Sequence, residues 1–171
     1  MILYQSVYNS PIGKLTVVSD DQSLTGIWFE DQKYFGSTLT EKPVRKDDVK
    51  AIVQVSSWLD RYFAGANPDP HELPLAPQGT PFRQAVWKIL LEIPNGGTMT
   101  YGEIASRIAG DRGMQRMSAR AVGGAVGHNP ISIVIPCHRV IGWDGRLTGF
   151  GGGLSRKEWL LEHEGWVRPA G

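Results

Sequence analysis

A proline-rich segment between residues 64 and 78 constrains the fold of this chain more than any other sequence feature. Proline fixes φ and has no backbone N–H, so neither a helix nor a strand can run across the segment. With 171 residues, the chain is long enough for two small domains. We therefore predict one domain at residues 1–78 and another at residues 79–171. The prolines are Pro68, Pro70, Pro74 and Pro77.

The first of these domains is predicted to be a small α/β scaffold. Three short apolar runs, separated by turn-forming residues, indicate an antiparallel meander. The spacing of apolar residues predicts a helix at residues 47–63, with Asp47 or Asp48 as its cap and Gly65 at its end. No residue pattern in this half indicates chemistry. The apolar runs are residues 2–8, 14–19 and 24–29.

The second domain is predicted to be mostly helical. Thr80 caps a first helix, and Thr100 with Glu103 has the spacing of a capping box that begins a second one. Another short helix, at about 117–128, consists almost entirely of small residues and carries Arg120 near its start. The helix that begins at Thr100 and the helix at about 117–128 resemble a helix-turn-helix. The small side chains of the second favour contact with a DNA minor groove. Most short helix pairs are packing units, so this pattern alone does not establish DNA binding.

Charge is distributed unevenly between the two halves of the chain. Residues 1–79 carry seven Lys/Arg against ten Asp/Glu, a net −3, whereas residues 80–171 carry eleven against seven, a net +4. The basic half is rich in arginine, which binds phosphate through a planar fork. This excess indicates a nucleic-acid partner, although a solvated basic face is the more common cause of such a pattern.

The composition excludes several other classes of protein. No run of eighteen apolar residues is present, so we expect no membrane span. The N-terminus lacks a charged leader and an apolar segment. The single cysteine can neither form an internal disulfide nor complete a zinc cluster. We expect a protein of the reducing cytoplasm with no metal site.

The single cysteine follows an apolar, largely β-branched run at residues 131–136. This run is predicted to be a buried strand that ends where Pro136 removes a ladder donor. His138 and Arg139 come directly after Cys137, and cationic neighbours favour a reactive thiolate. Because successive strand residues face opposite sides, His138 reaches Cys137 only if the chain turns or if a water or third group links them. A lone cysteine is, however, most often a small buried hydrophobe.

The last part of the chain contains a glycine-rich loop and a helix. The loop, residues 148–153, is not followed by the Gly-Lys-Ser/Thr sequence of a phosphate-binding loop, so we expect it only to expose backbone N–H groups. Ser155 and Glu158 have capping-box spacing at the start of the helix, which ends at Gly165. Glu164 is unusual there, because a carboxylate opposes the dipole at a helix C-terminus. It indicates a specific partner, unless it is merely exposed and screened.

Together these motifs resemble the O6-alkylguanine-DNA alkyltransferases, the methylated-DNA–protein-cysteine methyltransferases. The resemblance centres on the Pro-Cys-His-Arg-Val motif at residues 136–140 and covers residues 80–171, with a looser similarity over the first domain. It implies an α/β (α+β) fold, with a ribonuclease-H-like N-terminal domain and a winged-helix-like helix-turn-helix in the C-terminal domain. Reinforcing motifs are Tyr101-Gly102, Arg120-Ala121-Val122-Gly123, Asn129-Pro130, Lys157-Glu158-Trp159-Leu160-Leu161 and His163-Glu164-Gly165.

The resemblance implies a reaction, the irreversible transfer of an alkyl group from O6 of guanine to the protein. O4-alkylthymine is a further candidate substrate, and no cofactor is implied. Cys137 would be the nucleophile and acceptor, and His138 would deprotonate it through a water. Glu164 would orient His138, which would explain a carboxylate at a helix end, and Asn129 would brace the active-site turn. Nucleophile, base and orienting group together are the general means of activating a thiol.

Further residues are implied to bind double-stranded DNA from its minor groove. The alkylated nucleotide must be flipped out of the stack before a buried thiol can reach O6. Arg120 would fill the vacated stack, and Tyr101 would crowd the target's phosphate and donate to the base. The backbone of Val140 and of the loop near Gly151 would contact the base edge. Ser132 differs from the residue of some relatives and Phe150 from that of many, and both positions bear on which alkyl groups fit.

Two other classes of function remain open at this point. One is a non-enzymatic protein of the alkyltransferase-like type, which binds alkylated DNA but has no nucleophilic cysteine, so Cys137 argues against it. The other is a cysteine hydrolase using Cys137 and His138, for which the sequence marks no oxyanion hole. Under the alkyltransferase interpretation we expect a monomer.

Overall fold

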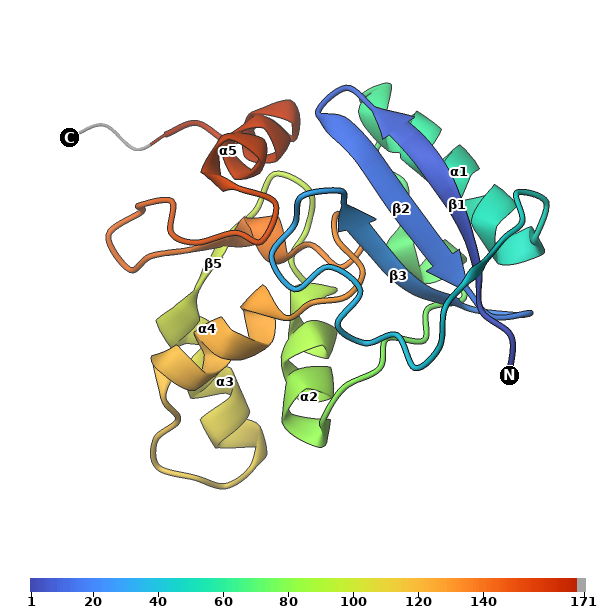
Figure 1. Ribbon diagram of the computed structural model, residues 1–171. Helices are drawn as coiled ribbons and strands as arrows, with labels where there is room; N and C mark the ends of the chain where they lie inside the picture. Colours follow the sequence, from blue (N-terminus) through green and yellow to red (C-terminus); the bar gives the residue numbers. More distant parts are fainter. Residues whose placement is uncertain (169–171) are drawn as a thin grey trace. The chain divides into compact units, whose positions relative to one another are not determined.

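The computed structural model describes residues 1–168, which form two compact units (Figure 1). The first unit comprises residues 1–78 together with Pro130–Val134, and the second comprises the rest of the chain. The chain therefore crosses between the units three times. An N-terminal sheet with one long helix precedes a mostly helical C-terminal part, which confirms the predicted fold class. No helix among the described residues is long and apolar enough to cross a membrane.

A four-stranded sheet is the frame of the first unit. Strands β1 (Tyr4–Ser10), β2 (Gly13–Ser19) and β3 (Leu24–Phe29) are the antiparallel meander that the sequence predicts. A short strand that was not predicted, β4 (Val44–Arg45), pairs in parallel with β1 and completes the order β3-β2-β1-β4. Every residue of β3 is buried, because later segments of the same unit cover its second edge.

The proline-rich segment is one of these covering segments. It contains a single 3₁₀ turn, η1 (Pro70–Glu72), and one isolated bridge from Leu75 to Leu24, as expected where proline excludes longer regular structure. Beyond this turn the chain returns to β3, where the N–H of Leu24 donates to the carbonyl of Pro74 at 2.7 Å. The N–H of Ala76 in turn donates to the carbonyl of Leu24 at 2.8 Å. The segment is thus fixed to the sheet by backbone hydrogen bonds.

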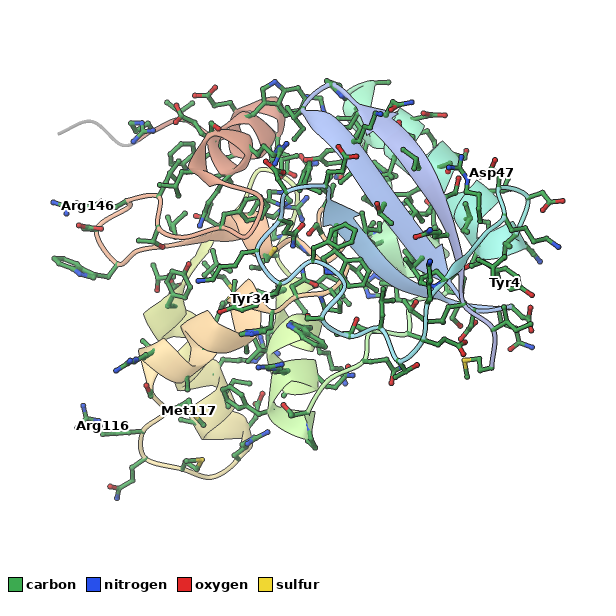
Figure 2. All side chains as sticks on the ribbon, viewed as in Figure 1. Tyr4, Tyr34, Asp47, Arg116, Met117 and Arg146 are labelled. Atoms are coloured by element: carbon green, nitrogen blue, oxygen red, sulfur yellow. The ribbon has the colours of Figure 1, made fainter. Side chains whose placement is uncertain are left out.

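Helix α1 (Lys50–Phe63) packs one apolar face against the three long strands. Its N-cap is Val49, which makes no side-chain capping bond, so the predicted cap by Asp47 or Asp48 is wrong. The carboxylate of Asp47, which is labelled in Figure 2, instead accepts hydrogen bonds from two side chains outside the helix. A short polar side chain bonds whichever donor is nearest, and here two donors compete with the helix N-terminus. They are Ser6 (2.7 Å) and Arg45 (2.6 Å).

The segment Pro130–Val134 is buried, but the strand predicted there does not form. Only one bridge joins it to β3, where Ile27 bonds the carbonyl of Pro130 (2.8 Å) and the N–H of Ser132 (3.1 Å). The chain then turns at Ile133, which has φ +73°, and the next N–H donates back to the Ser132 carbonyl at 2.9 Å. This is the rare γ-turn with positive φ, a strained conformation for a β-branched residue. Hydrophobicity therefore predicted the burial correctly and the backbone conformation wrongly.

Two capped helices begin the second unit, as the sequence predicts. Helix α2 (Pro81–Leu90) has Thr80 as its N-cap. The Thr80 hydroxyl accepts a hydrogen bond from the backbone N–H of the third helical residue. Helix α3 (Tyr101–Asp111) starts with the complete capping box of Thr100 and Glu103. Each cap satisfies backbone donors that a helix leaves unpaired at its N-terminus.

Helix α4 (Ala119–Gly127) contacts both α2 and α3. Its small side chains allow close approach, and the indole N–H of Trp87 in α2 donates to the Ala125 carbonyl at 2.8 Å. Ser118 is its N-cap. The chain between α3 and α4 is a turn and a loop, so the predicted pair of short helices is present.

The rest of the second unit consists of short strands and a last helix. Strand β5 (Met99–Thr100) pairs in parallel with β6 (Val140–Ile141). Helix α5 (Leu154–His163) begins after Gly153, which has φ +96° and no side chain with which to cap it. The predicted capping box of Ser155 and Glu158 is therefore wrong, because the helix starts one residue before that serine.

Candidate active site

The backbone turns twice around the cysteine. The N–H of Cys137 donates to the carbonyl of Ile135 at 2.8 Å, across Pro136 with φ −81° and ψ 64°, which is an inverse γ-turn. A single 3₁₀ turn, η2 (Cys137–Arg139), follows. The chain therefore turns after Pro136, as one of the two alternatives expects, and the link between the two side chains by a water or a third group stays a prediction. Cys137 is almost fully buried, with 6% of its surface exposed.

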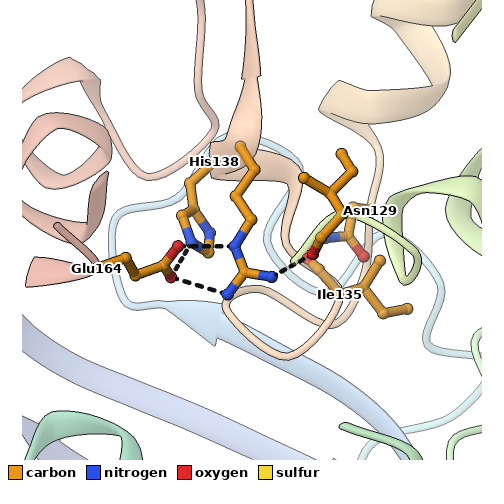
Figure 3. Close-up of polar contacts among 6 residues, drawn as sticks. Asn129, Ile135, His138 and Glu164 are labelled. Atoms are coloured by element: carbon orange, nitrogen blue, oxygen red, sulfur yellow. Dashed lines mark hydrogen bonds and ion pairs between the residues drawn. The ribbon is translucent and has the colours of Figure 1, made fainter. Parts of the chain in front are cut away.

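His138 and Glu164 form a buried pair. The ring Nε2 lies 2.7 Å from Glu164 Oε2, and neither side chain is exposed (Figure 3). Burial lowers the pKa of His138, the Glu164 carboxylate raises it, and the net shift is downward, so the ring is neutral at pH 7. A neutral ring that donates from Nε2 to a carboxylate has its lone pair on Nδ1. Nδ1 has no hydrogen-bond partner among the described residues, so it is available as a proton acceptor.

Glu164 also binds Arg139, which sequence reasoning did not include in the site. Arg139 Nε donates to Oε1 at 2.7 Å and Nη2 to Oε2 at 3.1 Å, while Nη1 donates to the carbonyl of Ile93 at 2.6 Å (Figure 3). Burial works against the charged form of Glu164, but His138 and Arg139 hold the pKa of this carboxyl well below its usual range. These two partners explain a carboxylate at the C-cap of α5, where the helix dipole opposes it.

Asn129 fixes the turn that carries the cysteine. Its Nδ2 donates to the carbonyl of Ile135 at 2.8 Å, and its side chain also hydrogen-bonds Cys137. Burial raises the pKa of the Cys137 thiol, whereas this hydrogen bond and the charge of Lys157 lower it; the net shift is upward. The thiol is therefore protonated at pH 7 and needs a base before it can act as a nucleophile.

Lys157 is a second residue that sequence reasoning missed. It is fully buried in the first turn of α5, and its Nζ donates to the carbonyls of Val140 and Thr148. Burial lowers its pKa to about 8. The spacing of Lys157 with Leu160 and Leu161 places all three on one helix face, a signal that could have indicated a buried lysine.

The residues implied to handle DNA occupy several elements of the second unit. Tyr101 begins α3, and its hydroxyl accepts a hydrogen bond from Thr148 at 3.0 Å. Burial raises the pKa of Tyr101, and Cys137 raises it further, while the Thr148 bond lowers it. Arg120 is exposed on α4 and makes no ion pair within residues 1–168. Val140 is fully buried in β6.

The positions implied to border the alkyl group are dispersed. Phe150 and Gly151 are half-buried in the loop before α5. Ser132 belongs to the first unit, where its hydroxyl donates to Gln32 Oε1 at 3.0 Å. Among the predicted residues, the structure thus joins Asn129, Cys137, His138 and Glu164 most closely. Within residues 1–168, no group of three or more His, Cys, Asp or Glu is arranged to bind a metal ion.

Comparison with known proteins gives a consistent result over the whole chain. Residues 3–77 match the family described as 6-O-methylguanine DNA methyltransferase, ribonuclease-like domain, and residues 81–166 match the DNA binding domain of the same description. A methylated-DNA–protein-cysteine methyltransferase of Haemophilus influenzae is 46% identical over 162 residues, which are 95% of this chain and 86% of that protein.

Solved structures agree with this match. The crystal structure of Mycobacterium tuberculosis O6-methylguanine methyltransferase aligns with a TM-score of 0.79 and 44% identity, over 95% of this chain and 93% of that one. The M. tuberculosis OGT in complex with DNA aligns with a TM-score of 0.78 and 42% identity, over 96% and 92% of the two chains. The chain therefore belongs to the 6-O-methylguanine-DNA methyltransferase family.

Proposed function

We propose that this protein repairs DNA by moving the alkyl group from O6 of an alkylated guanine to Cys137. The observation that carries this proposal is the relay beside the only cysteine, in which a neutral, buried His138 is oriented by Glu164 and has a free Nδ1. A buried thiol with a raised pKa needs such a base. We place DNA binding and transfer in the second domain, residues 79–171, and treat residues 1–78 as a scaffold.

The transfer is a single displacement at the alkyl carbon. The thiol proton passes to His138 Nδ1 through one water, and Glu164 stabilises the imidazolium that forms. The sulfur then attacks the alkyl carbon, a C–S bond forms, and the bond from carbon to O6 breaks with its electron pair remaining on guanine. The imidazolium of His138 gives its proton back to the water and the purine takes up one proton at N1, so the net change is thiol and alkylguanine to thioether and guanine. Because a thioether is stable, each molecule acts once.

Access to O6 requires that the nucleotide leave the duplex. We assign Arg120 to the vacated stack, since it is exposed on a helix of small residues that fits a minor groove. Tyr101, whose pKa is raised by burial and by Cys137, would donate from its hydroxyl to the flipped base. The backbone of Val140 and Gly151 would contact the base edge, and Ser132 and Phe150 would limit the size of the alkyl group. One copy of the chain contains all of these residues, so a monomer suffices.

The decisive experiment is incubation with a duplex that contains one O6-methylguanine, followed by intact mass measurement. We expect a mass gain of one methylene, at most one per chain, which is absent in Cys137→Ala. Turnover without modification of the protein would instead support a hydrolase. Tight binding without any mass gain would support the alternative of a non-enzymatic protein that binds alkylated DNA, which the presence of Cys137 argues against.

The role of Arg120 can be tested separately from the chemistry. Arg120→Ala should slow repair of the duplex much more than reaction with the free O6-alkylguanine base, because only the duplex requires flipping. Lys88→Ala, an exposed cation on α2, is the matched control. Equal loss on duplex and free base would reject the assignment.

A further inference from the structure

Trp143 stands apart from the other tryptophans of the chain because its side chain lies in solvent. It is 89% exposed, a fraction that only Met1 equals among the large hydrophobic side chains of residues 1–168. The other five tryptophans are buried or half-buried. An indole in solvent adds nothing to the hydrophobic core of its unit. Tryptophan is enriched where a partner covers its large apolar ring, so this position has the character of a contact site.

The turn that carries Trp143 is held together by its own hydrogen bonds. The N–H of Gly145 donates to the carbonyl of Gly142 at 2.9 Å, which makes Trp143 and Asp144 the central residues of a β-turn. The N–H of Gly142 in turn donates to the carbonyl of Arg146 at 2.9 Å. The Asp144 carboxylate binds both the backbone N–H of Arg146, at 3.2 Å, and its Nε, at 3.0 Å. The indole is therefore presented to solvent by a well-bonded turn.

Both ends of this turn are joined to the candidate active site. On one side it follows β6, which continues directly from η2 and pairs with β5, the strand that ends immediately before Tyr101. On the other side the hydroxyl of Thr148 donates to the hydroxyl of Tyr101 at 3.0 Å. Trp143 follows Ile141 by two residues, so the two Cα atoms are at most about 7 Å apart. The turn therefore projects from the neighbourhood of Tyr101, to which the flipped base is assigned.

Arg146 adds an exposed cation to the same turn. Its side chain is 83% exposed, and within residues 1–168 its guanidinium is bonded only through Nε, to Asp144. The label in Figure 2 marks this side chain at the outer end of the loop. The N–H groups on its two Nη atoms are left for a partner, and such a planar fork suits phosphate. The turn thus presents an apolar ring and a phosphate donor three residues apart.

The surroundings of the turn favour DNA as this partner. Tryptophan and arginine also dominate contacts between proteins, so the two side chains alone do not identify it. However, residues 80–171 carry eleven Lys/Arg against seven Asp/Glu, and an excess of positive charge attracts the phosphate backbone. A duplex that delivers its guanine to the site beside Tyr101 also brings the neighbouring sugars and phosphates to the base of the turn.

We propose that residues 142–146 form a clamp on the DNA strand beside the alkylated nucleotide. The Trp143 indole packs against a deoxyribose ring, and the Nη groups of Arg146 bind the adjoining phosphate. This inference rests on the proposed function, which brings the duplex to the site, and it involves no covalent step. Contacts with sugar and phosphate carry no sequence information, so the clamp holds the strand without limiting the sequences in which a lesion is repaired.

The first test measures binding of an O6-methylguanine duplex to protein that carries Cys137→Ala, so that no alkyl transfer takes place. Adding Trp143→Ala should weaken binding about tenfold, within the range of aromatic contacts with nucleic acids. Trp143→Phe should recover most of the affinity, because a second aromatic ring can cover the sugar. Val53→Ala, which truncates a 52% exposed apolar side chain of the first unit, is the control and should bind normally. Undiminished affinity in Trp143→Ala would overturn the proposal and leave the turn to a protein partner.

The phosphate contact of Arg146 is tested by salt. Each phosphate contact contributes about 0.9 to the slope of log affinity against log salt concentration, so Arg146→Gln should lower that slope by about 0.9. Lys88→Gln, the same change at an exposed cation of α2, should leave the slope as it is. An equal slope with and without Arg146 would reject the phosphate contact.

Tryptophan fluorescence reports the contact of the indole itself. The duplex should quench the emission of the Cys137→Ala protein more than that of the same protein with Trp143→Phe, since only the first has an indole in the turn. Equal quenching would contradict the packing of Trp143 on DNA. None of these measurements needs alkyl transfer, so they can fail while the unmodified protein still gains a methylene from the duplex. Binding that depends on Trp143 without that gain would reject alkyl transfer alone.

Discussion

Ion pairs in the two units have similar lengths but very different surroundings. In the first unit, Arg61 and Glu72 lie 2.7 Å apart with side chains 48% and 45% exposed. In the second unit, Glu164 lies 2.7 Å from both His138 and Arg139, and these three side chains are 0%, 0% and 10% exposed. Water screens the first pair and not the second group. Distance alone therefore does not distinguish the two groups, whereas burial does.

The largest effect is expected from Glu164→Gln. This change leaves Arg139 as a buried cation without its counter-charge and removes the group that stabilises protonated His138. Breaking a buried pair in this way costs about 3–5 kcal/mol. Urea unfolding should show that loss, and transfer from O6-methylguanine duplex should fall to near zero. Full stability in the variant would show that Glu164 is effectively solvated.

Acidification should lower the stability by a smaller amount, and the groups responsible should lie in the second unit and not in the first. The pKa values of His138 and Glu164 are both lowered in the folded protein, so the unfolded chain binds more protons. Stability should therefore be lost as pH falls, first below about 6.5 as the unfolded histidine is protonated and further below about 4.3 for the glutamate. Urea unfolding at a series of pH values measures this.

The matched control for acidification is Asp69→Asn in the first unit. The pKa of Asp69 is also lowered, by hydrogen bonds from the backbone and side chain of His71, but both side chains are exposed. His138→Gln should remove the upper part of the pH dependence, whereas Asp69→Asn should leave the curve almost unchanged. The comparison would break down if both variants flattened the curve equally.

The smallest effect is expected from Glu72→Gln. Its partner Arg61 is exposed, so water replaces the ion pair at little cost. Neither urea unfolding nor alkyl transfer should change measurably. A loss comparable with that of Glu164→Gln would contradict the conclusion that burial, and not distance, separates the two groups.

Local sequence signals predicted those features that depend on neighbouring residues. The meander of β1–β3, the Thr80 cap and the capping box at Thr100 each involve side chains a few positions apart, and all three are confirmed. The cap at Asp47 and the capping box at Ser155 are wrong, although their local patterns are equally good. In the first case Arg45 and the distant Ser6 bind the carboxylate, and in the second the helix already begins at Leu154, one residue before the predicted cap.

The site was predictable only in part, because some of its contacts join residues that are far apart in the sequence. The family resemblance implied the pairing of His138 with Glu164, and the structure places them 2.7 Å apart. The sequence presents Arg139 only as a cation beside the thiol, and its contact with Glu164, 25 residues away, has no local signal. Lys157 belongs to one of the motifs that carry the resemblance, but burial of a lysine is decided by the whole unit. The roles of all the predicted site residues stay predictions.

The three crossings of the chain between the units have a consequence for cooperativity. Pro130–Val134 is bonded to β3 in the first unit, yet Ile135, the next residue, accepts the hydrogen bonds of Asn129 and of the Cys137 N–H in the second. Local unfolding of the β3 edge would therefore release one end of the turn that carries the cysteine. The backbone amide of Ser132 should accordingly exchange with solvent at the rate of β3, and the reactivity of the thiol should depend on the folding free energy of a unit that contributes none of the relay residues.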